Sequence, residues 1–85
     1  SVGAESLKEE QEEGLWRLWL LSLGPRPEEL RQFLIEEGLL AEGHEALVLE
    51  LPVLLKEGTS REAAYALAAR LEEAGGRVRL EFVPR

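Results

Sequence analysis

The stretch LPVLLKEGTSREAAYALAARLEEAGGRVRLEFV, residues 51–83, decides the fold, because the order of its elements can be read from its pattern. The segment of residues 53–56 is short and apolar and lies between Pro52 and Gly58, which indicates a strand. The middle of the stretch predicts a helix. Residues 78–82 alternate apolar and charged side chains, as a strand with one buried face does. The stretch therefore predicts the order β-α-β.

The helix in this stretch has a predicted start, a buried stripe and an end. Thr59 and Glu62 have the spacing of a capping box, in which the hydroxyl and the carboxylate each bind a backbone N–H at a helix start. Gly75 predicts the end, because glycine adopts the left-handed conformation there without a Cβ clash. Between them, apolar residues three or four positions apart form one stripe: Ala64, Leu67, Leu71 and Ala74. We therefore expect a helix with one buried face.

Length, composition and charge restrict the function. A chain of 85 residues is one small domain. It has no cysteine, no aspartate and one histidine, so a catalytic triad or a zinc site would have to be built mainly from glutamates. We expect no enzyme activity, no metal and no cofactor. The net charge of −7 disfavours nucleic acid, whose phosphates attract Lys and Arg, and favours a protein partner.

Residues 1–14 contain five Glu and one Lys but few apolar side chains, which predicts an acidic flexible tail or linker before a domain at residues 15–85. The start without Met indicates a trimmed chain or a piece of a longer one. The sequence contains neither a run of about 18 apolar residues nor a secretion signal, so we expect no membrane insertion and a cytoplasmic location. A composition without Asn, Asp, Cys or Met is compatible with a heat-adapted source.

Residues 15–23, LWRLWLLSL, predict the first strand, because this apolar run is short and ends at Gly24-Pro25. Alternation directs Trp16, Leu18 and Leu20 toward the helices. The other set faces the open side of the sheet: Arg17, Trp19 and Leu21. An aromatic and aliphatic patch on a small sheet indicates an interface. In the alternative interpretation, Trp19 is covered by the N-terminal tail or by flanking loops.

Residues 27–38 predict the first helix. Pro27 suits a first helical turn, and Glu28 and Glu29 complement the positive end of the helix dipole. Gly38 predicts the end of this helix. Its buried stripe consists of Leu30, Phe33 and Leu34.

Residues 42–51, EGHEALVLEL, fit two patterns. His44, Leu47, Val48 and Leu51 have helical spacing, whereas Leu47, Leu49 and Leu51 alternate as in a strand. A helix gives β-α-α-β-α-β, a small α+β fold with a three-stranded antiparallel sheet and its helices on one face. A strand gives the ferredoxin-like order β-α-β-β-α-β.

Several motifs together resemble the C-terminal domain of the bacterial ribosomal stalk protein. The resemblance covers roughly residues 16–83 and favours the helix for residues 42–51. It rests on Pro52, Lys56-Glu57-Gly58, the helix cap Ser60, Leu71-Glu72-Glu73-Ala74-Gly75, Val78, Gly38-Leu39, Leu47-Val48, residues 16–20 and Gly24.

The resemblance implies a site on the first two helices, since the stalk family recruits translational GTPases through a basic and apolar surface there. Arg26 and Arg31 stand at lysine positions of that surface, and Leu30 at an aliphatic contact position. Other positions depart from the family: Glu42 and Glu45 replace lysines, Leu34 replaces an arginine, and Pro27 and Glu28 replace small apolar residues. Such charge reversals disfavour the usual acidic partner.

Two functional hypotheses follow. The first is a protein-interaction domain of stalk type, which binds a protein partner, in its sharper form a translational GTPase, through Arg26, Leu30, Arg31, Leu34, Glu42 and Glu45. The second is a structural or assembly module of ferredoxin-like or sporulation-repeat type. Such a module would form a homodimer through its sheet, at Trp16 and Trp19.

Overall fold

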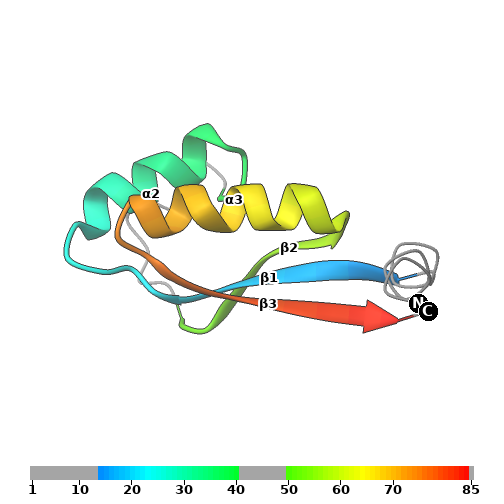
Figure 1. Ribbon diagram of the computed structural model, residues 1–85. Helices are drawn as coiled ribbons and strands as arrows, with labels where there is room; N and C mark the ends of the chain where they lie inside the picture. The colour runs from blue at the N-terminus through cyan, green and yellow to red at the C-terminus, as the bar shows by residue number, and fades with distance from the viewer. Residues whose placement is uncertain (1–13, 41–49, 85) are drawn as a thin grey trace.

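The computed structural model describes residues 14–40 and 50–84. The elements in these ranges are β1 (Gly14–Ser22), α2 (Pro27–Glu36), β2 (Val53–Thr59), α3 (Arg61–Glu73) and β3 (Arg77–Pro84). They form the predicted small α+β fold, with a three-stranded antiparallel sheet and both helices on one face (Figure 1). Of the tail predicted at residues 1–14, residues 1–13 lie outside the described residues, and Gly14 already belongs to β1. Of the helix or strand predicted at residues 42–51, residues 42–49 lie outside them, and Glu50 and Leu51 belong to neither a helix nor a strand.

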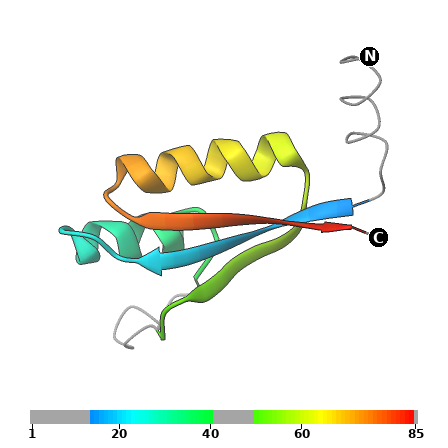
Figure 2. The same cartoon turned by 60° about the horizontal axis from the view of Figure 1, so that its bottom comes forward.

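The first strand of the chain lies in the middle of the sheet, whose order is β2-β1-β3 (Figure 2). In the register with β3, Leu18 lies opposite Leu80 and Trp19 opposite Arg79. The register with β2 is shifted on either side of Leu18. Because β3 pairs with β1 alone among the described strands, its other side is a sheet edge.

The core lies between β1 and the two helices. Leu18 and Leu20 of β1 are 0% exposed, which confirms that this set of the alternating residues faces the helices. The rest of the buried cluster comes from α2 and α3: Leu30, Leu34, Ala68 and Leu71. Leu67 and Phe33 pack against it partly buried. The two predicted helical stripes are therefore confirmed.

α3 starts one residue after the position that the capping-box spacing predicts, with the serine cap that the stalk resemblance implies. Ser60 is the N-cap, and its Oγ accepts a hydrogen bond from the Ala63 backbone N–H at 3.2 Å. Thr59 is still the last residue of β2 and is only 8% exposed. The prediction that Thr59 caps the helix is therefore wrong, because the strand continues one residue further and buries the Thr59 side chain.

Two glycines allow the turns at one end of the fold to touch. Gly24 (φ +78°) follows β1 and Gly75 (φ +97°) follows α3, so both have left-handed backbone conformations, as expected for Gly75 after a helix. A Cβ on Gly24 would lie 1.9 Å from the Gly75 carbonyl oxygen. Beside this contact, Arg26 Nη2 donates a hydrogen bond of 3.2 Å to the Glu73 carbonyl oxygen. The start of α2 is thereby held against the end of α3.

Candidate functional site

The open face is the face of the sheet that carries neither α2 nor α3. Side chains alternate along β1, and directly paired residues of neighbouring strands lie on the same face. Arg17 of β1 pairs with Glu81 of β3, and Trp19 pairs with Arg79 of β3 and Leu54 of β2. At one end of the open face, Leu15 pairs with Val83.

Charged groups are tied together across the open face. Arg17 lies between two carboxylates, with Nε 3.7 Å from Glu57 Oε2 and Nη1 3.7 Å from Glu81 Oε1. The Trp19 indole Nε1 donates a 3.1 Å hydrogen bond to the same Glu81 oxygen. The Arg79 guanidinium lies 6.0 Å from the Trp19 ring centroid. Exposed ion pairs contribute about 0–1 kcal/mol each to stability, so their main effect is to fix the positions of these groups.

This network covers part of the Trp19 side chain, since Arg79 lies over the indole ring and Glu81 accepts a hydrogen bond from the indole N–H. The tail and loop residues that the alternative interpretation names lie in part outside the described residues. Trp16, in contrast, is on the helical face. Its ring centroid is 5.7 Å from that of Tyr65 on α3 and 5.3 Å from that of Phe82. Of the two tryptophans that sequence analysis assigns to a sheet interface, Trp19 alone belongs to the open face.

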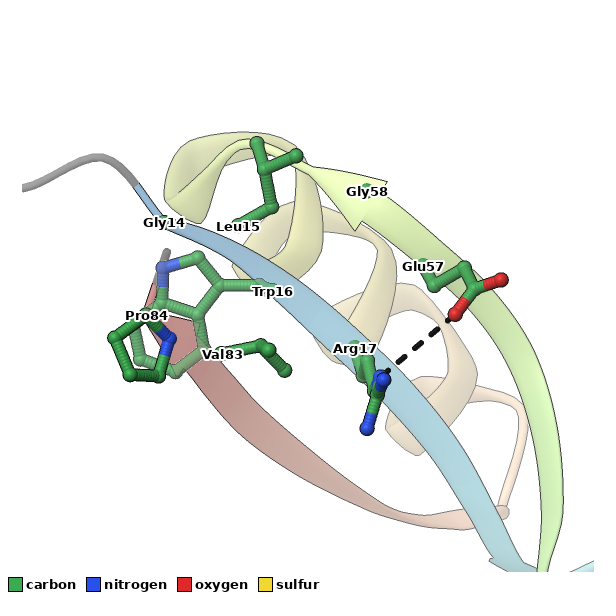
Figure 3. Close-up of a pocket in the computed structure, with 8 residues that line it drawn as sticks. All are labelled: Gly14, Leu15, Trp16, Arg17, Glu57, Gly58, Val83 and Pro84. Atoms are coloured by element: carbon green, nitrogen blue, oxygen red, sulfur yellow. Dashed lines mark ion pairs between the residues drawn. The ribbon is translucent and has the colours of Figure 1, made fainter.

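Exposed apolar side chains flank the network. Leu15 is 47% exposed and Leu21 is 38% exposed, at opposite ends of β1. Beside Leu15 lies an open hollow of about 400 Å³, with Val83 and Pro84 on one side and Arg17 and Glu57 on the other (Figure 3). This volume is within the range of ligand pockets, roughly 300–1,000 Å³. The arrangement offers an apolar surface next to a fixed ion pair.

Two leucines that the stalk resemblance assigns to a partner-binding surface on the helices are buried in the core. Leu30 and Leu34 are four positions apart on α2 and both belong to the core, 0% exposed, so neither side chain is available to a partner. This corrects their assignment as partner contacts. Glu42 and Glu45 lie outside the residues that the structure describes.

The two arginines of that surface are in different environments. The Arg26 side chain is 51% exposed, and its Nη1 lies 3.8 Å from Glu29 Oε2. The Arg31 side chain is only 17% exposed and forms an ion pair with Glu28. Its Nε atom is buried and has no hydrogen-bond partner among the described residues. Arg26 is therefore the more accessible cation of this pair.

Within residues 14–40 and 50–84, no group of three or more histidine or acidic side chains is placed to hold a metal ion. No helix in the same ranges is both long and apolar enough to cross a membrane. A comparison of the chain with models of protein families finds no match, and a comparison with curated proteins finds none.

Sequence analysis identified part of the open face. It named Arg17, Trp19 and Leu21, and the structure places all three on β1, with Leu21 exposed and Arg17 and Trp19 joined through Glu81. It missed Glu81, although the alternation of β3 already separates this residue from the buried set. It also missed the hollow, which forms where the ends of three strands meet and has no counterpart in local sequence.

Proposed function

We propose that the chain is a non-enzymatic protein-interaction domain that binds a segment of a partner protein on its open face. The observation that carries the proposal is the combination of exposed Leu15 and Leu21 with an ordered charged network between them. Interfaces place apolar anchors beside polar groups that set orientation. The partner segment would insert an apolar side chain against Leu15 and Val83 and direct a polar group toward Arg17 and Glu57.

A second candidate is recruitment of a translational GTPase through α2, as the stalk resemblance implies. The exposed Arg26 at the start of α2 supports it, because a basic group is expected there. The burial of Leu30 weighs against it, since this leucine stands at the aliphatic contact position of that surface. A cytoplasmic site of action belongs to this candidate.

Selection from a displayed peptide library, with the full chain as bait, tests the first proposal. The wild-type chain should enrich sequences with an apolar anchor. Leu15→Glu should lose them, because a carboxylate would be desolvated against the anchor. Arg26→Glu is the control on the helical side. It also places a carboxylate at an exposed position, although it changes the net charge by two units instead of one, and it should retain them.

Two results would contradict the proposal. In the first, no sequence is enriched by wild type over Leu15→Glu. In the second, the enriched sequences, or purified elongation and initiation GTPases, bind in a way that depends on Arg26 and is indifferent to Leu15. The second result would favour the stalk-type function instead.

A further inference from the structure

The outer edge of β3 has no strand beside it among the described residues, and it carries a sequence that is complementary to itself. Its residues are RVRLEFVP, from Arg77 to Pro84. When two such strands run antiparallel with Leu80 opposite Leu80, Arg79 of each copy lies opposite Glu81 of the other. The pairing also brings Val78 opposite Phe82. Opposite charges placed directly across two strands stabilise the pair, and like charges destabilise it.

The two charges on this edge differ in the contacts that they already make. Arg79 is exposed and forms no ion pair with the residues that the structure describes, although its guanidinium lies near the Trp19 ring. Glu81 is half-buried, and its Oε1 already accepts the Trp19 indole N–H and lies 3.7 Å from Arg17 Nη1, so Arg79 of a second copy would share this carboxylate. Natural sheet edges commonly avoid association through charges that repel a second copy. Here the two charges are of opposite sign and two positions apart, so a two-fold axis at Leu80 makes them attract.

α3, the helix above this edge, has one flank toward α2 and an exposed flank on the other side. α3 lies over β1 and β3 (Figure 1). Its Arg70 pairs with Glu37 and stacks on Phe33, so that flank faces α2. Helical periodicity places Tyr65 and Ala69 on the opposite flank. Tyr65 is 48% exposed. A small residue such as Ala69 permits the roughly 8–10 Å approach of two packed helices.

We propose that the chain forms a two-fold symmetric dimer in which the β3 strands pair edge to edge around Leu80, with Arg79 and Glu81 bridging the copies. The described strands of the two copies then form one continuous six-stranded sheet. The hollow beside Leu15 lies at the end of β3, where the register places Arg77 of the other copy opposite its Val83. An isologous interface of this kind closes on itself, so assembly stops at the dimer. The inference does not depend on the proposed partner binding.

Charge exchange tests the dimer, with sedimentation equilibrium of the full chain as the measurement. Wild type should dimerise. Arg79→Glu and Glu81→Arg should each weaken the dimer by about ten-fold or more, since each converts two attractive pairs into two repulsive ones. An equimolar mixture of the two variants should recover the dimer as a heterodimer, and the double variant Arg79→Glu/Glu81→Arg should recover it as a homodimer. Recovery also shows that the single variants fold.

Arg77→Glu is the matched control, because it makes the same charge change as Arg79→Glu on the same strand. In the proposed dimer, however, the residue opposite Arg77 is the uncharged Val83 of the other copy. This variant should leave the dissociation constant within about two-fold of wild type, since no charged pair is altered. A wild-type chain that stays monomeric at the highest concentrations that remain in solution would overturn the proposal. A dimer that neither single variant weakens would also overturn it. So would a dimer that the mixture of variants fails to restore but that Leu21→Glu abolishes, because this result would place the contact on the open face.

Discussion

At the scale of single residues, two turns depend on glycine for different reasons. Gly24 and Gly38 have almost the same left-handed backbone, with φ of +78° and +74°. A Cβ on Gly24 would meet the Gly75 carbonyl oxygen, whereas a Cβ on Gly38 would meet no atom of the described residues within 4 Å. The two positions therefore separate the cost of the backbone conformation from the cost of a steric clash.

Gly38→Ala should lower the free energy of unfolding by about 1–2 kcal/mol, the cost of a left-handed conformation for alanine. Gly24→Ala should lower it by about 2–5 kcal/mol, because overpacking adds to the same conformational cost. Urea unfolding of both variants gives the comparison. Equal losses would show that the turns after β1 and α3 do not touch as described.

At the scale of elements, the helix starts show what local sequence specifies. The buried stripe of α3 follows from spacing alone, and both Ala64 and Leu71 are buried as expected. The position of the N-cap does not follow from spacing, because Thr59 and Ser60 are both good caps by residue type. Which of them acts is decided by where β2 ends, and this depends on pairing with Trp16 of β1. Periodicity could therefore be predicted from the sequence, but the boundary required the tertiary structure.

Ser60→Ala should cost about 1 kcal/mol of stability, the usual loss for a missing N-cap. Thr59→Val should cost no more than about 0.5 kcal/mol, because the Thr59 hydroxyl does not cap α3 and valine retains the β-branched shape in the strand. Thermal and urea unfolding measure both changes. A larger loss for Thr59→Val than for Ser60→Ala would assign the cap to Thr59 after all.

At the scale of the whole molecule, the two helices of the described residues cover one face of the three-stranded sheet (Figure 2). The other face carries the charged network, and the exposed Leu15 and Leu21 lie at opposite ends of β1. Alternation was enough to predict that Arg17 and Trp19 lie on the open face, whereas Leu21 is exposed but lies where the register with β3 shifts. The partners of these side chains were not predictable, because they come from β2 and β3 and depend on strand register. The same limit affects the helical surface: a resemblance can assign Leu30 and Leu34 to a contact, but packing decides that they are buried.

The central claim is that a partner segment binds on the open face, and nuclear magnetic resonance of the ¹⁵N-labelled chain tests it most directly. A peptide enriched by the wild-type chain is added stepwise, and its binding is mapped by the shifts of backbone amides and of the indole N–H groups. We predict shifts at Leu15, at Val83 and at the Trp19 indole, which is bonded to Glu81. An unmoved Trp19 indole, with shifts confined to Arg26 and its neighbours on α2, would contradict the account.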